Sequence, residues 1–407
     1  MHILYLQQLL VPPGGPGNSR CWEFAAQWAA QGHRITFVSS AAHIPPQHPV
    51  RRGLSLPCYA RMDGVEMYLL DVPYSHMMPL PRRAAAFVQF MLKARRLIRF
   101  LDADAVLAYT APPSVAALGR WAAGLLKRPF FLEVADVWPD VPQGMGLLPG
   151  WAAAPLQQHM RTCYAAAERI FAYSEGMKAQ MVSQGADPER VLVSPNGVRL
   201  GRFGPQPLPL HRGLRALYAG TMGRANGVQF LLDAAARLHA RGRDDIRLTL
   251  IGDGTEGARI RDAAARLNLP NLEILPPVPS GDVPGLMRQF EAGIVCFAPY
   301  PVLEANSATK WFEYLAAGLP VLINYGGWQA EWLDRHACGL AAPQGDLEAF
   351  VRNLIALADD PARRRDMGLR ARRLAEASFG RHVLASRMLE EMQAAVQAGS
   401  SQAARAR

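Results

Sequence analysis

The sequence predicts an α/β protein of two doubly wound, Rossmann-like domains that face each other across a cleft. Three observations lead to this fold class. With 407 residues, half of them apolar and 19% charged, the chain is long enough for two or three domain cores. Short apolar runs alternate with longer helical patterns, which is typical of parallel sheets wrapped by helices. This alternation occurs twice, once on each side of a segment rich in glycine and proline.

The first half of the chain is predicted to hold six strands separated by helices. Two clear helical patterns run from Cys21 to Gly32 and from Ser114 to Leu126. The strands are the apolar runs at 2–8, 34–40, 65–72, 104–110, 129–136 and 169–175.

The second half repeats the pattern with five predicted strands and a helix from about Val228 to Arg241. These strands lie at 214–220, 246–254, 272–278, 291–299 and 320–326. The linker is predicted near residues 195–213, where periodicity is lost. In such folds ligands bind beyond the carboxyl ends of the strands, so the cleft between the two domains is the expected site.

Composition narrows the class of partner. The net charge of +10 and the isoelectric point near 9.7 favour nucleic acid, anionic lipid headgroups or phosphorylated small molecules. No nucleic-acid recognition module accompanies the arginine-rich C-terminal region, so we expect no nucleic-acid partner. The five cysteines lie far apart, which indicates neither a zinc site nor a disulfide framework and fits a reducing cytoplasm. Because no leader or long apolar run is present, we expect a protein that is soluble or lies on a membrane surface.

Glycine-rich turns follow three of the predicted strands, in "VPPGGPGNSR", "YAGTMGRANG" and "IGDGTEGAR". A glycine lets backbone N–H groups approach an anion at a helix start, although such a turn is also common without any ligand. The first two turns match neither the dinucleotide fingerprint nor a Walker motif, which disfavours hydride transfer and nucleotide hydrolysis. The glycines concerned are Gly14, Gly15, Gly17, Gly220, Gly252 and Gly254.

The stretch "ATKWFEYLAAGLPVLIN" places a lysine and a glutamate at the start of a predicted helix. If Ser307 or a neighbour caps this helix, Lys310 falls in the first turn, where the helix dipole disfavours a lone cation. A bound diphosphate would compensate, since helix N–H groups and an ammonium together form an anion site. Glu313 shares the face of Lys310 and lies where a carboxylate can bind the hydroxyls of a ribose. The alternative is an ordinary ion pair on the helix surface.

With these motifs the chain resembles the family 4 glycosyltransferases of the GT-B fold. The glycine turn after the first strand, "SPNGV" near the domain junction and "ATKWFEYLAAGLPVL" carry the resemblance, which covers nearly the whole chain. The segments "DVWPD" and "TKWFEYLAAG" are most similar to bacterial enzymes that build surface polysaccharides, including the fucosamine transferase-like group.

The resemblance implies retaining transfer of a hexosyl or N-acetylhexosaminyl group from a nucleotide diphosphate sugar, UDP-linked by expectation, to a glycan or polyprenyl-diphosphate-linked acceptor. The nucleotide sugar is a substrate, and no cofactor is implied. Residues 1–197 would bind the acceptor and 198–375 the nucleotide sugar, while 376–407 would form a helix that returns to the first domain and a frayed tail. Two alternatives stay open: an inactive nucleotide-sugar-binding module and a nucleotide-sugar epimerase on the same fold.

Carried over by position, Glu313 matches the second glutamate of the family's E-x7-E motif, which holds the nucleotide ribose. The first glutamate would fall at Ala305, so Glu304 is the nearest candidate for the donor sugar, with backbone N–H groups or Asn306 as substitutes. The arginine and lysine with which the family binds the diphosphate align with Thr221 and Asn226. The diphosphate would therefore be bound by other cations, and Arg224 and Lys310 are available. The expected donor-binding residues are Gly15, Gly17, Gly220, Arg224, Gly252, Gly254, Asn306, Lys310 and Glu313.

Two expectations concern catalysis. Asp136 follows an apolar strand, so it lies at a carboxyl strand end where it could accept a proton or orient an acceptor hydroxyl, or else cap a turn. With Glu313 it is the expected catalytic residue. The D-x-D at Asp102 and Asp104 is better explained as a helix end running into a strand. Because cations and a helix N-terminus can neutralise a diphosphate leaving group, we expect metal-independent transfer.

The segment 82–101 predicts an amphipathic helix with six basic residues and no acid between Arg82 and Arg99. Such a helix can lie on an anionic membrane, or its apolar stripe can pack on the first sheet. A lipid-linked acceptor would make membrane docking useful. We therefore expect a cytoplasmic location, with peripheral association at the inner face of the plasma membrane as a further possibility for this surface. The stripe consists of Phe87, Phe90, Met91, Ala94, Leu97, Ile98 and Leu101.

Overall fold

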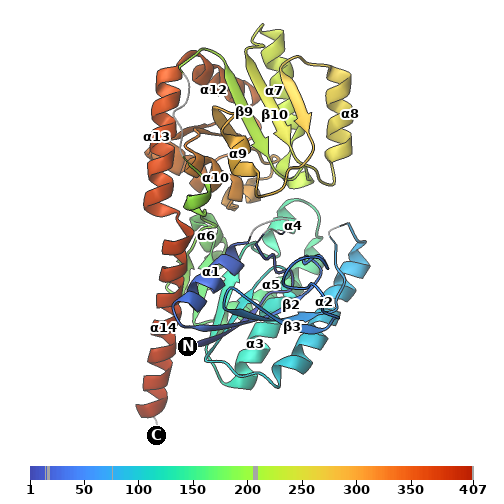
Figure 1. Cartoon of the computed structure of the whole chain (residues 1–407), viewed down its shortest axis with the longest axis vertical. Helices are drawn as coiled ribbons and strands as arrows, with labels where there is room; N and C mark the ends of the chain where they lie inside the picture. The colour runs from blue at the N-terminus through green and yellow to red at the C-terminus, as the bar shows by residue number, and fades with distance from the viewer. Residues whose placement is uncertain (14, 16–18, 76, 205–209, 406–407) are drawn as a thin grey trace. The chain divides into compact units, whose positions relative to one another are not determined.

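The structure of the chain is a computed structural model that describes residues 1–13, 15, 19–75, 77–204 and 210–405. It divides into two compact units (Figure 1). Unit 1 contains Met1–Pro195 and Arg381–Arg407, and unit 2 contains Asn196–Gly380. The boundaries thus lie two residues before and five residues after the predicted ones, because the N–H of Val198 bonds to the carbonyl of Phe379 and holds both segments in unit 2.

The described part of unit 1 has an eight-stranded sheet in the order β3-β4-β2-β1-β5-β6-β7-β8. Neighbouring strands are parallel except for β3, which pairs with β4 in the antiparallel sense. Two of these strands, β3 and β8, were not predicted from the sequence. The bounds are β1 His2–Leu6, β2 Arg34–Ser40, β3 Cys58–Met62, β4 Val65–Leu70, β5 Ala105–Tyr109, β6 Phe130–Val134, β7 Arg169–Ala172 and β8 Val191–Val193.

Helices cover the sheet of unit 1. Figure 1 shows α14, in red, beside α1, in blue, and the indole N–H of Trp28 on α1 donates to the carbonyl of Ala385 on α14 at 2.9 Å. Leu384, Met388 and Met392 of α14 complete the apolar core under this face. The bounds are α1 Arg20–Ala30, α2 Leu80–Ile98, α3 Ser114–Leu126, α4 Asp140–Gly144, α5 Gly150–Ala166, α6 Glu175–Ser183 and α14 Arg381–Arg405.

Helix α2 uses its apolar stripe to pack within unit 1. Phe90, Ala94 and Ile98 are buried. Lys93 donates to the carbonyl of Asp71 at 2.6 Å, and the guanidinium of Arg95 lies 5.0 Å from the ring centroid of Trp121. Three residues of the predicted stripe are therefore core, as its alternative explanation required, while Phe87, Met91, Leu97 and Leu101 are half-buried.

A buried polar network fixes the start of α1. The guanidinium of Arg20 pairs with the carboxylate of Glu133 on β6, and the two side chains are 1% and 0% exposed. Arg20 also donates to the hydroxyl of Ser194 at 2.7 Å and to the carbonyl of Pro195 at 3.3 Å. The hydroxyl of Tyr173 donates to Glu133 at 2.7 Å. This network ties the first turn of α1 to the last residues before the boundary of unit 1.

The described part of unit 2 has a six-stranded parallel sheet in the order β11-β10-β9-β12-β13-β14. Its strands are nearly continuous apolar runs because both faces are covered. The strand bounds are β9 Leu214–Ala219, β10 Ile246–Ile251, β11 Leu272–Leu275, β12 Ala292–Val295, β13 Val321–Ile323 and β14 Gly339–Ala341. The helix bounds are α7 Gln229–Ala240, α8 Gly257–Leu267, α9 Val283–Met287, α10 Thr309–Ala317, α11 Trp328–Arg335, α12 Leu347–Asp359 and α13 Pro361–Ser378.

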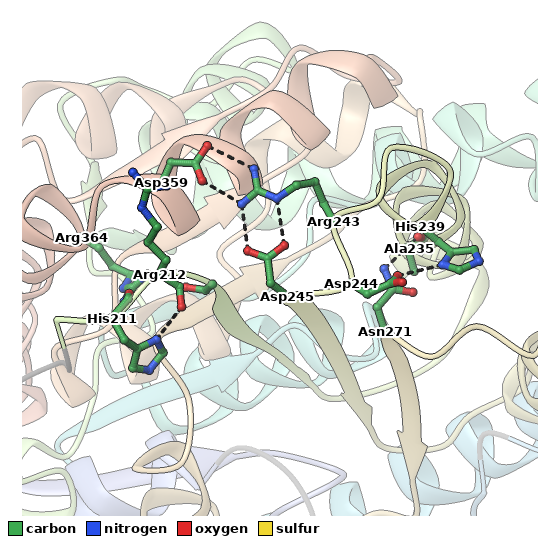
Figure 2. Close-up of polar contacts among 11 residues, drawn as sticks. His211, Arg212, Ala235, His239, Arg243, Asp244, Asp245, Asn271, Asp359 and Arg364 are labelled. Carbon is green, nitrogen blue, oxygen red and sulfur yellow. Dashed lines mark hydrogen bonds and ion pairs between the residues drawn. The ribbon is translucent and has the colours of Figure 1, made fainter.

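Ion pairs hold the amino edge of this second sheet (Figure 2). The guanidinium of Arg243 lies between two carboxylates, with contacts of 2.8 and 3.0 Å to Asp245 and of 3.1 and 2.8 Å to Asp359. This arrangement joins the start of β10 to the last residue of α12. These polar groups lie at the amino ends of the strands, opposite the edge where parallel sheets bind ligands, so we assign them to stability.

None of the helices in the described part of the chain combines the length and the hydropathy that a membrane crossing requires.

Candidate functional site

The carboxyl edge of the unit 2 sheet gathers most of the predicted donor residues. Strand β9 ends at Ala219 and leads into the turn with Gly220, while β10 ends at Ile251 and leads into Gly252 and Gly254. Helix α10 begins at the same edge after the loop that leaves β12. Parallel strands therefore bring residues from three separate segments to one edge of the sheet.

The two glycine turns pack backbone against backbone. Gly220 and Gly252 have φ angles of +150° and +149°, which L side chains rarely adopt. A Cβ atom on Gly252 would lie 1.9 Å from the carbonyl oxygen of Gly220, and one on Gly254 would lie 2.7 Å from that of Met222. The N–H of Gly220 donates to Ile251 at 2.8 Å, and that of Met222 to Asp253 at 2.9 Å. These glycines are required by the close approach of the two turns themselves.

Helix α10 begins without a side-chain cap. Its N-cap is Ala308, and no side chain accepts a hydrogen bond there. Ser307 therefore does not cap the helix: the N-cap position falls on its neighbour Ala308. The Ser307 hydroxyl is buried without a partner among the described residues. The carbonyl of Ser307 instead accepts from the side-chain amide of Asn196 at 2.5 Å. The first-turn N–H groups of α10 are thus not capped by a side chain, which suits an anion.

Lys310 lies in the first turn of α10 and extends toward the glycine turn of β9. Its Nζ would lie 2.6 Å from a Cβ atom placed on Gly220, so a side chain at that position would displace the amine. Nζ is 3.9 Å from the centroid of the Tyr218 ring. Burial lowers the pKa of Lys310 to about 8, against the smaller opposite effects of Cys296 and Glu313. The ammonium is thus partly desolvated and would gain from an anionic ligand.

Glu313 is half-buried one turn further along α10 and is close enough to Lys310 to raise its pKa. The next residue, Tyr314, is buried, and its hydroxyl accepts from the backbone N–H of Ala219 at 2.9 Å. A Cβ on Gly293 would lie 2.2 Å from the Tyr314 ring, so this ring sits directly on β12. Tyr314 thereby fixes the distance between α10 and the end of β9.

Glu304 is engaged with the protein itself. It lies in the short 3₁₀ turn Pro301–Ala305, and its carboxylate accepts from the backbone N–H of Gly326 at 3.3 Å, just ahead of α11. This bond gives Glu304 a structural role in holding the loop, and it competes with the role of donor-sugar ligand that the sequence suggested. Asn306, two residues on, keeps a buried side-chain oxygen without a partner among the described residues. That oxygen can accept from a sugar hydroxyl or amide.

The other cation candidate, Arg224, is exposed at the tip of the β9 turn. Its guanidinium donates to the hydroxyl of Tyr300 at 3.3 Å. The side chain belongs to the same edge as Lys310 and Gly254, but unlike Lys310 it is held by this single contact among those that the structure records for the described residues.

Unit 1 carries the acceptor-side candidate Asp136 and the first glycine turn, whose Gly15 and Gly17 were expected to bind the donor. Asp136 is half-buried beyond the end of β6, and burial raises the pKa of its carboxyl to about 6. It is also close enough to Tyr109, at the end of β5, to raise the pKa of that phenol. In the first glycine turn, the N–H of Gly15 donates to the carbonyl of Pro12 at 3.0 Å. Gly14 and Gly17 lie outside the described residues.

The D-x-D pair serves the fold. Asp104 accepts from the backbone N–H of His2 at 2.7 Å, and Asp102 accepts from that of Ala103 at 2.8 Å. In the parts of the chain that the structure describes, no group of three or more His, Cys, Asp or Glu residues is arranged to hold a metal ion.

Sequence reasoning overlooked three residues of the unit 2 site: Tyr218, Tyr314 and Asn196. Tyr218 stands inside an apolar strand and Tyr314 on the buried face of a helix, so both were indistinguishable from core residues. Asn196 lies in the quoted "SPNGV", but only the fold shows that its amide reaches Ser307.

Two protein-family models match the chain. The family model described as "Glycosyl transferase 4-like domain" matches residues 14–197, and "Glycosyl transferases group 1" matches residues 208–374. The chain carries the domains of the family 4 glycosyltransferases. The first of these matches covers unit 1 up to its boundary and two residues beyond, and the second lies within unit 2, which also contains Lys310.

The individual relatives share less than a third of their residues with this glycosyltransferase over the matched regions. It is 29% identical to a D-inositol 3-phosphate glycosyltransferase of Pseudarthrobacter chlorophenolicus over 56% of each chain. It is 23% identical to the amylovoran biosynthesis glycosyltransferase AmsK of Erwinia amylovora, over 58% of this chain and 59% of that one. The matched region thus spans less than two thirds of the length of these relatives.

Solved structures share the GT-B fold over nearly the whole chain. A sucrose-phosphate synthase from Thermosynechococcus elongatus has a TM-score of 0.80 at 16% identity and covers 98% of this chain and 99% of its own. Anabaena HepE in complex with UDP-glucose has a TM-score of 0.68 at 16% identity, with 97% and 100% covered. The predicted fold class, two doubly wound α/β domains of the GT-B type, is confirmed. The fucosamine transferase-like specificity has no support among these relatives.

Proposed function

We propose that this glycosyltransferase moves a sugar from a nucleotide diphosphate sugar, with a UDP-sugar as the donor, to a glycan or polyprenyl-diphosphate-linked acceptor with retention of configuration. The observation that carries the proposal is the partly desolvated Lys310 ammonium at an uncapped helix N-terminus, beside Gly220. Support for UDP comes from the HepE structure with UDP-glucose, and support for a polysaccharide product comes from AmsK. Hexosyl and N-acetylhexosaminyl donors are both compatible with the side-chain oxygen of Asn306, which can accept a hydrogen bond from a sugar hydroxyl or from an amide N–H.

The proposed mechanism neutralises the leaving group. When the bond between the anomeric carbon and the diphosphate oxygen breaks, negative charge grows on the diphosphate, and Lys310 with the first N–H groups of α10 stabilises it. Glu313 accepts hydrogen bonds from the ribose hydroxyls. The acceptor oxygen forms the new bond to the anomeric carbon, and Asp136 is proposed to take the proton of its hydroxyl. Because these groups supply the charge, we propose transfer without a divalent metal.

A second candidate function is an inactive nucleotide-sugar-binding module. Ala305 stands at the position where the family has a glutamate, and the neighbouring Glu304 is bonded to Gly326. Such a module would bind the nucleotide diphosphate but form no product. An epimerase on the same fold would convert the donor sugar without an acceptor, so product analysis with and without acceptor separates all three functions.

The test of the donor site is thermal stabilisation by UDP, GDP and ADP, each free and sugar-linked, followed by turnover in EDTA. We expect one base to stabilise the protein selectively, with the shift lost in Lys310→Ala and reduced in Glu313→Ala. Lys178→Ala, on a helix of unit 1, is the matched control and should respond like the unchanged protein. Absence of any shift, or an unchanged shift in both site variants, would refute the donor site.

We also propose that α2 meets an anionic membrane with its outward face rather than with the predicted stripe. Val88 and Leu92 are 50% and 51% exposed, and Arg96 and Arg99 continue the same face toward the C-terminal end. Together they offer apolar contact followed by positive charge, which suits peripheral binding at the inner face of the plasma membrane by a cytoplasmic enzyme.

The membrane proposal predicts co-sedimentation of the protein with vesicles of phosphatidylglycerol and phosphatidylcholine but not with phosphatidylcholine alone. The double variant Arg96→Gln/Arg99→Gln should reduce binding by roughly tenfold or more, since each basic residue contributes about 1 kcal/mol. Arg61→Gln/Arg128→Gln removes the same charge elsewhere on unit 1. Equal loss in this control pair would mean that net charge, and not the α2 face, is responsible.

A further inference from the structure

The amine of Lys310 rests on the face of an aromatic ring. Its Nζ is 3.9 Å from the centroid of Tyr218, a residue of β9 whose side chain is fully buried. The hydroxyl of Tyr218 donates to the backbone carbonyl of Thr221 at 2.6 Å. The tip of the ring is therefore tied to the same turn that holds Gly220, and the buried surroundings hold the ring in place.

The other groups near this amine do not replace the ring as a counterpart. Cys296 approaches from the end of β12, and burial raises the pKa of its thiol to about 12, so it is neutral. Tyr314 is also neutral because burial raises its pKa. Glu313, which lies on α10 itself, carries the negative charge that raises the pKa of Lys310. Among the described residues Lys310 forms no salt bridge within 4 Å, so the negative ring face is its closest recorded support.

The sequence of the β9 turn explains why such support is needed. Thr221 and Asn226 occupy positions where the resemblance implies cations, so positive charge must come from another element. Lys310 brings it from α10. A lysine has four rotatable bonds and a freely moving ammonium, whereas a diphosphate site needs the charge at one place.

We propose that Tyr218 is a positioning residue that holds the Lys310 ammonium beneath Gly220, ready for the diphosphate of the donor. The inference rests on the proposed function, because it assigns Lys310 to the diphosphate. It also makes a prediction that the assignment of Lys310 alone does not make. The aromatic face of Tyr218 should contribute more to diphosphate affinity than its hydroxyl, since the ring stabilises the ammonium charge and the hydroxyl only anchors the ring.

The test compares Tyr218→Phe, which keeps the ring face, with Tyr218→Leu, which removes it. The ligand is whichever of UDP, GDP or ADP stabilises the unchanged protein most, and its dissociation constant is measured by calorimetry. Tyr218→Leu should weaken binding by roughly five- to thirtyfold, the usual range for a cation on an aromatic face. Tyr218→Phe should stay within roughly threefold. Leu250→Ala, a buried strand variant of the same core, controls for loss of stability.

A second readout needs no ligand. The chain has four lysines, Lys93, Lys127, Lys178 and Lys310, so ¹³C-methylated lysines give four NMR signals whose titrations can be followed separately. In Tyr218→Leu the Lys310 signal should titrate at lower pH than in the unchanged protein, while Tyr218→Phe and Leu250→Ala leave it in place.

The outcomes separate the two claims. If Lys310→Ala abolishes binding while Tyr218→Leu matches Leu250→Ala in affinity and in the Lys310 titration, the positioning role is wrong and the proposed function stands. If Lys310→Ala binds the nucleotide normally, the donor-site assignment fails. A downward shift of the Lys310 titration confined to Tyr218→Leu, together with weaker binding, would establish the positioning role.

Discussion

Replacing Arg20 by leucine should lower the free energy of unfolding of the protein by about 3–5 kcal/mol, because it leaves the buried carboxylate of Glu133 without its charge partner. Both side chains are essentially unexposed, so water cannot replace the lost interaction. The bonds from Arg20 to Ser194 and Pro195 are lost as well. Such a cost is a large part of the stability of a typical domain.

Urea unfolding followed by tryptophan fluorescence checks this expectation, since Trp22 and Trp28 lie in the core of unit 1. The double variant Arg20→Leu/Glu133→Leu should regain most of the loss, because it removes the orphaned charge. The control is Arg34→Leu, whose partner Glu66 lies in the same unit while Arg34 itself is 62% exposed. That variant should cost no more than about 1 kcal/mol. Equal losses in Arg20→Leu and Arg34→Leu would contradict the importance of burial.

Donor affinity should fall steeply above pH 8. The protonated form of Lys310 is the one that attracts a diphosphate, and without ligand its pKa is about 8. A bound anion favours the charged form and raises this pKa, so binding takes up a proton in alkaline solution. Well above pH 8 the dissociation constant should rise about tenfold per pH unit, which amounts to roughly 50-fold from pH 8 to pH 10 because half of the free lysine is already neutral at pH 8.

Calorimetry with a sugar-linked nucleotide at pH 7 to 10 measures this slope directly. Lys310→Arg is the control, because a guanidinium stays charged over this range and its affinity should be flat. The ligand-free protein should show the matching effect on stability. Since the unfolded lysine has its ordinary pKa of 10.5, the unfolded chain binds more protons between pH 8 and 10.5, and the lysine contributes increasing stability as pH rises. A pH-independent affinity in the unchanged protein would argue against the Lys310 assignment.

The fold could largely be predicted from the sequence because most of its strands are buried on both faces. Runs such as Arg34–Ser40 and the helix Ser114–Leu126 have the observed bounds. The missed strands are short or at edges: β8 and β14 have three residues each, too few for a period, and β3 alternates with exposed residues at the edge of the sheet. Local pattern cannot identify an element whose conformation depends mainly on its neighbour.

The site was predictable only in part. Lys310 stood out because a cation in a first helical turn needs a compensating anion. Tyr218 did not, because only the folded chain brings Lys310 of α10 against the ring of this β9 residue. For Glu304, the position beside the missing glutamate suggested a sugar ligand, and the fold adds a hydrogen bond from the N–H of Gly326 that spacing could not indicate. Side-chain direction, rather than spacing, decides these cases.

The place of α14 has a consequence for synthesis. Unit 2 is one continuous segment, whereas the core of unit 1 lacks Leu384, Met388 and Met392 until the last part of the chain has been made. On the ribosome, Asn196–Gly380 can therefore finish folding while the earlier half still waits for its final helix. The half that is translated first is completed last, and a stop anywhere before Arg381 leaves unit 1 with an open apolar face.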